Sequence, residues 1–180
     1  KHPNWNIIIL RENYDKLTDF VFKKFNWFYQ IYLNYQFPIQ RCDTIRYMLL
    51  YYFGGIYSDL DVSPNKSSGK LLAKYPWANI IIGIAREKDT NKCKLTTQYE
   101  SIRKGEPEIP IRLSNYLMLA RIPNHPIWID ILNQAKKRAN SKIKSQYGII
   151  YTTGPDIVTT AISINRSKYK DIAIIPYNEL

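Results

Sequence analysis

RCDTIRYMLLYYFGGIYSDLDV, residues 41 to 62, contains a change of hydrophobic period from which the architecture of this 180-residue chain can be worked out. Residues 39 to 53 include no proline or glycine and are rich in Leu, Met, Ile and aromatics, which predicts a mostly buried helix. Gly54-Gly55 tolerate positive φ, as residues after a helix end often must. Residues 56 to 62 then alternate between apolar and polar, which predicts a strand.

Two aspartates close this predicted strand. Tyr57, Asp59 and Asp61 should point to one side of it and the apolar residues to the other, because strand side chains alternate. Carboxylate oxygens suit Mg²⁺ or Mn²⁺, and a protein that offers one or two carboxylates usually shares the ion with a substrate's phosphates. Asp59 and Asp61 are therefore candidate metal ligands.

Asp43 and Arg46 are three residues apart on the preceding helix and so share a face. A carboxylate can accept hydrogen bonds from sugar hydroxyls, and a guanidinium can bind a phosphate in bidentate fashion. Simpler interpretations exist for each motif. A D-x-D triplet is common in sequences, and Asp43 and Arg46 would equally suit an exposed ion pair. An apolar strand that ends in unpaired acids would be costly, however, without a cation or donors.

This stretch resembles the sugar-nucleotide-binding region of the D-x-D glycosyltransferases of family 32, whose pattern is roughly S-D-x-x-R-x-x-x-L-x-x-x-G-G-x-Y-x-D-x-D. The clostridial glucosylating toxins share a related version. Within the family, the chain is most similar to the yeast-type mannosyltransferases that act on inositol phosphoceramide. Cys42 stands where the family usually has Ser or Ala. The resemblance implies an α/β domain of GT-A type, with a Rossmann-like mixed, mainly parallel sheet flanked by helices.

The resemblance also implies roles for these residues in retaining transfer from a nucleotide-diphospho-sugar. Asp61 would bind Mn²⁺ or Mg²⁺ directly, and Asp59 would support the ion and the ribose. Asp43 would hold sugar hydroxyls, Arg46 the sugar or a phosphate oxygen, and Tyr57 would pack near the nucleotide. No residue is singled out as a catalytic nucleophile.

Two further blocks match the family. Ser114-Asn115 followed by His125-Pro126 resembles its S-N-x-x-M…H-P block, in which the Asn faces the donor sugar. For His125, an ordinary position at a helix entry is the favoured interpretation. Thr152 to Pro155 resembles the family's T-G-P, where Gly154 either contacts the donor or caps a helix. These blocks favour GDP-mannose as donor, with UDP-sugars as the alternative, and the family acceptor is a glycan or glycolipid.

The remaining pattern predicts alternating strands and helices, hence a single α/β domain with parallel strands over residues 1–180. Polar residues 87 to 110 have no clean periodicity and are expected to form a loop near the donor site. The family's first strand and C-terminal end are expected to be missing. Strands are expected at Trp5–Leu10, Trp77–Ala85 and Ile172–Pro176, and helices at Asp15–Gln30, Ile127–Ala139 and from Pro155.

The net charge of +11 favours anionic partners: a nucleotide diphosphate, nucleic acid or an acidic membrane surface. No helix-turn-helix, zinc or RNP-type signature supports a nucleic-acid-binding module, so no nucleic acid partner is expected. A two-metal phosphohydrolase would need more acidic or histidine ligands. The basic surface leaves peripheral membrane contact as an expectation. Family resemblance points to the Golgi or endomembrane lumen, although this chain shows no signal or transmembrane segment.

Overall fold

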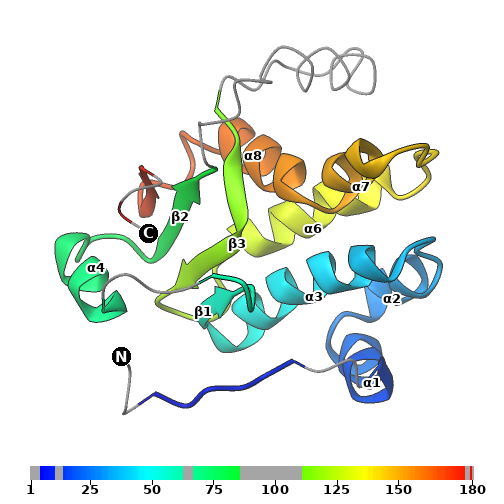
Figure 1. Cartoon of the computed structure of the whole chain (residues 1–180), viewed down its shortest axis with the longest axis horizontal. Coiled ribbons are helices and arrows are strands. Elements are labelled where there is room, and N and C mark those ends of the chain that lie inside the picture. Colours follow the sequence, from blue (N-terminus) through cyan, green and yellow to red (C-terminus); the bar gives the residue numbers. More distant parts are fainter. Residues whose placement is uncertain (1–4, 11–13, 63–66, 86–110, 177–178, 180) are drawn as a thin grey trace.

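The computed structural model describes residues 5–10, 14–62, 67–85, 111–176 and 179, and the loop expected at residues 87 to 110 lies outside them. A four-stranded sheet is flanked by helices (Figure 1). The strands are β1 (Gly55–Ser58), β2 (Ile80–Ile84), β3 (Leu113–Ala120) and β4 (Ile172–Ile175). The helices are α1 (Tyr14–Lys24), α2 (Asn26–Leu33), α3 (Pro38–Phe53), α4 (Ser68–Lys74), α6 (Ile127–Arg138), α7 (Gln146–Thr152) and α8 (Pro155–Ile164).

The strands are arranged in the order β1-β3-β2-β4. β3 pairs antiparallel with both β1 and β2, whereas β2 and β4 are parallel. The α/β class and the mixed sheet are thus confirmed. Among the described strands, β1, β2 and β4 run in one direction and β3 runs against them, so the sheet is mixed and mainly parallel, as expected.

Alternation along β2 divides the core between the two faces of the sheet. Ile80 and Ile82 belong to the large cluster under α3, α6 and α8, and Ile81 belongs to a smaller cluster under α4. β2 is buried along its length because helices cover both of its faces. Because β3 pairs with this buried strand, the helices on the two faces of the sheet also hold β3, the strand that carries the S-N motif.

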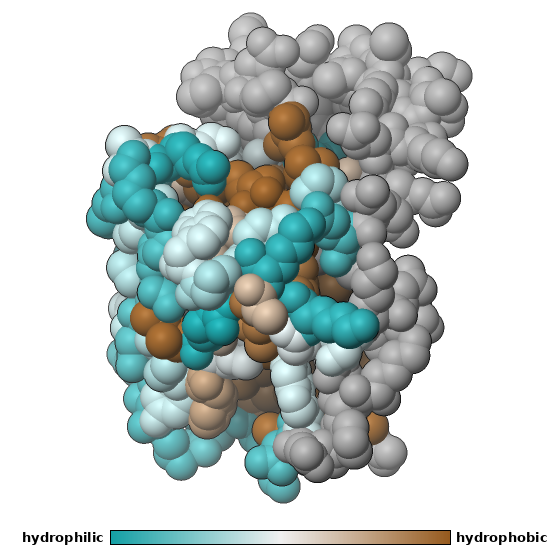
Figure 2. All heavy atoms as spheres, turned by 90° about the vertical axis from the view of Figure 1, so that its left-hand side faces the viewer, coloured by the Kyte–Doolittle hydropathy of each residue, from teal (hydrophilic) through white to brown (hydrophobic). Residues whose placement is uncertain are grey.

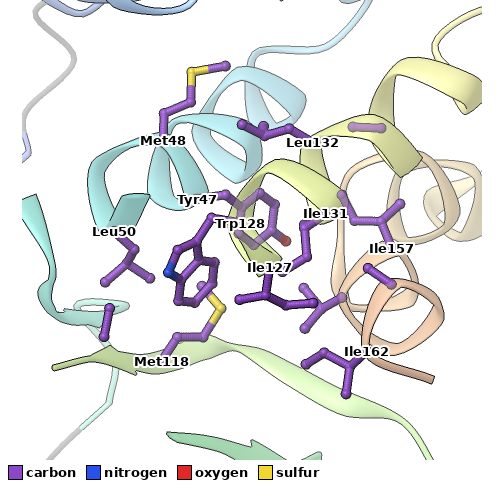
Figure 3. Packing of buried hydrophobic residues seen from close by; sticks show 14 of the residues in the cluster. Tyr47, Met48, Leu50, Met118, Ile127, Trp128, Ile131, Leu132, Ile157 and Ile162 are labelled. Atoms are coloured by element: carbon purple, nitrogen blue, oxygen red, sulfur yellow. The ribbon is translucent and has the colours of Figure 1, made fainter. Parts of the chain in front are cut away.

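Trp128 of α6 is the largest fully buried side chain of the core. It lies between α3 and β3, beside Tyr47 and Met118 (Figure 3). Its indole stacks on the Tyr47 ring, with centroids 6.5 Å apart and planes 18° apart. This contact holds the α3 face that carries Tyr47 in place, and α3 also carries the candidate site residues.

Two sequence predictions differ from the structure. Trp5–Leu10 is extended but is not a strand of the sheet, and Ile7, Ile8 and Ile9 are 78%, 83% and 58% exposed. A β-branched run becomes a central strand only when neighbouring strands pair with it, and the described strands do not. The helix expected over Asp15–Gln30 is divided at Phe25, whose backbone leaves helical geometry (φ −133°, ψ 44°) while its ring enters the core.

The face that carries α4 mixes hydrophilic and hydrophobic residues (Figure 2). Its described part is not uniformly hydrophilic. This fits the scattering of lysines along the sequence, which favours solvation over one extended anion-binding face.

Gly54 makes the sharp transition from α3 to β1. Its φ is +68° and that of Gly55 is +90°, as the Gly-Gly pair predicts. A Cβ on Gly54 would lie 3.1 Å from the carbonyl oxygen of Ala120 and 3.3 Å from the Pro123 nitrogen. Both the backbone angle and the space therefore favour glycine at this position.

We expect Gly54→Ala to lower the free energy of unfolding by about 1–3 kcal/mol, because the substitution adds φ strain and a backbone contact. Urea denaturation would measure the loss. Gly69→Ala, in α4, is the matched control: its Cβ would meet only the Ser67 Oγ at 3.4 Å, so it should be neutral or stabilising by up to ~1 kcal/mol. Equal effects of the two substitutions would contradict the role of Gly54.

Candidate functional site

The guanidinium of Arg46 joins α3 to the ends of β1 and β3. Its side chain is 5% exposed, with Nη2 2.9 Å from the Asp43 Oδ1. Nη1 donates to the Asn115 carbonyl oxygen at 2.8 Å and to the Asp59 Oδ1 at 3.2 Å. The alternative of an exposed Asp43–Arg46 pair is therefore wrong: the pair is buried and connects three elements.

The carboxylate of Asp43 is held from both sides. Asn115 Nδ2 donates to its Oδ1 at 3.1 Å, and Thr153 Oγ1 donates to its Oδ2 at 2.9 Å. The Asn115 amide also donates to the Tyr47 hydroxyl at 3.2 Å, which in turn donates to the Thr153 carbonyl oxygen at 2.9 Å. Asp43 thus accepts a closed set of hydrogen bonds that orients it.

Burial raises the pKa of the Asp43 carboxyl to about 6, and the Asp59 charge adds to this effect. Arg46 and the donated hydrogen bonds from Thr153 and Asn115 act in the opposite direction and favour the ionised form. Asp43 is therefore a carboxylate at neutral pH. It becomes protonated within one to two pH units below neutrality.

Asp59 connects this buried network to the surface. Its side chain is 33% exposed, and its Oδ1 accepts from the Tyr57 hydroxyl at 2.7 Å as well as from Arg46. The Tyr57 ring lies under the guanidinium, 4.8 Å from its central carbon. Burial raises the pKa of Tyr57 above its ordinary value, so its hydroxyl keeps its proton and remains a donor to Asp59.

Asp61 does not continue the alternation of β1. The strand ends at Ser58, and the chain turns over Asp59–Val62, where the Val62 N–H donates to the Asp59 carbonyl oxygen at 3.2 Å. The expectation that Asp59 and Asp61 share one strand face is wrong, because the Asp59 N–H still donates to the Tyr116 carbonyl oxygen of β3 at 2.8 Å, whereas Asp61 lies in the turn that follows. Asp61 is instead an exposed turn residue, two positions after Asp59.

The donor set at this turn suits a hard divalent cation that also binds a ligand. Asp59 is partly exposed and Asp61 is exposed, and both offer carboxylate oxygens. Among the described residues, no group of three His, Cys, Asp or Glu side chains could enclose an ion. A cation bound here would therefore complete its coordination with phosphate oxygens and water.

Gly154 reaches the network through its backbone. It precedes Pro155, the first residue of α8, and its carbonyl oxygen lies 3.5 Å from the Tyr47 hydroxyl. A Cβ at this position would come within 2.8 Å of the Ile150 Cα, so glycine allows α7 and α8 to approach closely. His125 lies at a helix entry, as favoured from sequence, where its Nδ1 accepts from the Ile127 N–H at the start of α6.

The structure thus brings Asp43, Arg46, Tyr57, Asp59 and Asn115 into one hydrogen-bonded network, with Gly154 at its edge and Asp61 in the adjoining turn. Sequence reasoning missed two members, Tyr47 and Thr153. Tyr47 is four residues from Asp43 and so lies on the same face of α3, a spacing that was available in the sequence. Thr153 directly precedes Gly154 in the T-G-P block, but its hydroxyl contact spans 110 residues.

Known proteins are similar to this chain over part or most of its length. Residues 1–78 match the family described as "Glycosyltransferase sugar-binding region containing DXD motif". Inositol phosphoceramide mannosyltransferase 2 of Schizosaccharomyces pombe is 27% identical over 169 residues, 94% of this chain and 39% of that protein. Inositol phosphoceramide mannosyltransferase 1 of the same yeast is 34% identical over 77 residues, 41% of this chain and 24% of its own length.

A mannosyl phosphorylinositol ceramide synthase of Saccharomyces cerevisiae is 27% identical over 154 residues, 86% of this chain and 32% of that enzyme. The chain therefore spans well under half of these relatives. Among solved structures, the PaToxG glycosyltransferase is similar, with a TM-score of 0.46 and 19% identity over 86% of this chain and 44% of that one. The resemblance to the D-x-D glycosyltransferases is confirmed by the family match and by the relatives. Through residues 1–78, the chain thus resembles the glycosyltransferase sugar-binding regions that contain the DXD motif.

Proposed function

We propose that the network around Asp43 and Arg46 is the donor site of a GT-A-type glycosyltransferase that uses a nucleotide-diphospho-sugar. The observation that carries the proposal is that a buried and an exposed environment meet at Asp59. The buried, oriented carboxylate of Asp43 lies on one side, and the partly exposed Asp59 and the exposed Asp61 lie on the other. A nucleotide sugar has matching parts, a neutral polyol and a charged diphosphate.

The buried side suits the sugar. A carboxylate that is fixed by Asn115, Thr153 and Arg46 accepts hydroxyl hydrogen bonds without having to reorganise. Such charge-assisted hydrogen bonds are about twice as strong as neutral ones. Asp43 therefore holds the sugar hydroxyls, and Asn115 faces the same group from β3.

The exposed side suits the diphosphate. Asp59 and Asp61 would hold Mn²⁺ or Mg²⁺, and the ion would neutralise the charge that develops on the leaving nucleoside diphosphate. Arg46 supplies a fixed positive charge between the two parts, and the Tyr57 ring packs beside it. Transfer proceeds with retention of configuration by resemblance to the family, and we assign no nucleophile.

Mannose from GDP-mannose is the favoured transfer, because relatives over most of this chain are named an inositol phosphoceramide mannosyltransferase and a mannosyl phosphorylinositol ceramide synthase. A UDP-sugar is the alternative donor. The acceptor is a glycolipid of the inositol phosphoceramide type, or a glycan, by the same reasoning from the relatives' names.

A glycolipid acceptor makes peripheral contact with a membrane useful, and exposed aromatics accompany lysines on one side of the molecule. Phe22 and Trp27 are 48% and 41% exposed, and the Lys136 ammonium lies 5.6 Å from the Trp27 ring. Aromatic rings and lysines are suited to an anionic interface. In the described residues, no helix is long and apolar enough to cross a bilayer.

The first test is a thermal-shift panel of GDP, GDP-mannose, UDP, UDP-glucose, UDP-galactose and a short oligonucleotide, each with and without Mn²⁺. We expect a Mn²⁺-dependent rise with one nucleotide class, since a ligand at a hundred times its Kd stabilises the folded state by about 2.7 kcal/mol. A shift with the oligonucleotide alone would refute the proposal.

Asp61→Asn should remove the Mn²⁺-dependent part of nucleotide binding, a loss of at least about tenfold in affinity. The melting temperature of the unliganded protein should not change, because Asp61 is exposed in a turn. Asp15→Asn, an exposed aspartate at the start of α1, is the matched control and should bind normally. Unchanged Mn²⁺-dependent affinity of the Asp61 variant would remove the metal assignment.

Binding of the sugar part should weaken as the pH falls through about 6, because Asp43 then takes up a proton and loses its charge. The measurement is the Kd for GDP-mannose divided by the Kd for GDP, determined at pH 8 and at pH 5. Both ligands carry the diphosphate, so this ratio removes any effect of pH on diphosphate binding. Asp43→Asn should bind GDP-mannose more weakly at pH 8 and show a flat ratio. A flat ratio in the unmodified protein would contradict the role of Asp43.

The membrane contact should depend on the same side chains that form the exposed patch. Sedimentation with phosphatidylserine vesicles should recover the protein at low salt and lose it at high salt, because the attraction is electrostatic. Trp27→Ala and Lys136→Ala should reduce the bound fraction. Equal binding to phosphatidylcholine vesicles would show that charge has no part in it.

A further inference from the structure

The corner between α7 and α8 delivers two groups to the candidate site. Thr153 Oγ1 donates to Asp43, and the Thr153 carbonyl oxygen accepts from Tyr47. Only Thr153 and Gly154 separate the two helices, and the close approach of Gly154 to Ile150 leaves no room for a side chain there. A shift of α8 relative to α7 would therefore move the Thr153 hydroxyl.

Arg138 connects the two sides of this corner. It is the last residue of α6 and is 4% exposed. Toward α7, its Nη1 donates to the Tyr151 carbonyl oxygen at 2.8 Å, and its guanidinium carbon lies 4.2 Å from the Tyr151 ring centroid. Toward α8, Nη1 lies 3.4 Å from the Asp156 Oδ1, and Nη2 donates to the Thr160 Oγ1 at 3.0 Å.

These contacts form a clamp around Thr153 and Gly154. Tyr151 precedes the corner by two residues, and Asp156 follows it by two. Thr160 also donates to the Asp156 Oδ1 at 3.1 Å, which closes the α8 side of the clamp. The planar, forked guanidinium can meet donors and acceptors in several fixed directions, whereas an ammonium on a flexible stem cannot.

We infer that Arg138 is a positioning residue for the donor-sugar site: it fixes the α7–α8 corner so that the Thr153 hydroxyl meets Asp43. This inference rests on the proposed function. Arg138 acts through Thr153, since its contacts described above are with α7 and α8. A buried ion pair alone contributes little net stability, so the geometric constraint is the stronger reason for a guanidinium here.

The test compares GDP-mannose with GDP, because only GDP-mannose carries the sugar that Asp43 would hold. Arg138→Lys keeps the charge but loses the fork, and Thr153→Val removes the delivered hydroxyl. Each should weaken GDP-mannose binding about tenfold, or ~1.4 kcal/mol, while GDP affinity stays within about twofold. The double variant should bind GDP-mannose no more weakly than the single variant with the lower affinity, because the two residues act through one contact.

Two further variants complete the design. Thr160→Val removes two hydrogen bonds on the α8 side of the clamp but leaves the contacts of Arg138 with α7. It should give a smaller loss with the same selectivity, even where Arg138→Lys folds poorly. Lys137→Ala, an exposed neighbour on α6, is the control and should change neither affinity. A loss of overall stability alone would lower the affinities for GDP-mannose and GDP equally and leave the ratio of the two Kd values unchanged.

Additive losses, or an unchanged GDP-mannose to GDP ratio in both the Arg138 and Thr160 variants, would overturn the positioning role. That result differs from failure of the proposed function. In the latter case the unmodified protein itself would bind neither GDP-mannose nor a UDP-sugar with Mn²⁺.

Discussion

The buried pair of Asp43 and Arg46 constrains the rest of this structure. Removing two charges from water costs several kcal/mol per ion unless hydrogen bonds and opposite charges compensate. Compensation comes from Asn115 on β3, Thr153 after α7 and Asp59 after β1. These elements converge on one helix face because each supplies a group that the pair requires.

The same constraint separates a rigid half of the site from an accessible half. Tyr47 is fixed by its stacking on Trp128, and its hydroxyl reaches both Asn115 and Thr153. The buried half of the candidate site, around Asp43, is therefore held in place by packing of the hydrophobic core. The turn that carries Asp61 lies at the surface, where carboxylates can exchange water for phosphate and a cation.

Much of this organisation follows from local patterns. The uninterrupted apolar run before Gly54 predicts α3, and the positive φ angles at Gly54 and Gly55 follow from the glycine pair. Local patterns fail where a neighbour decides the outcome. Trp5–Leu10 has strand composition but no pairing among the described strands. β1 ends at Ser58 because the chain turns directly after Asp59, whose N–H makes a further hydrogen bond to β3. Phe25 breaks a helix without glycine or proline, so no composition signal marks it.

The candidate site shows the same limit. The resemblance to a known family nominated Asp43, Arg46 and Asp59, and the structure joins them through hydrogen bonds. Thr153 was not found, because no spacing rule connects residues that are far apart in the chain.

The length of these connections also sets when the site can form during synthesis. Asn115 follows Asp43 by 72 residues and Thr153 follows it by 110. At about 5–20 residues per second, roughly 5–20 seconds pass before the last partner leaves the ribosome. Until then α3 exposes a charged pair that cannot be buried at low cost, so its docking must wait for the C-terminal third of the domain.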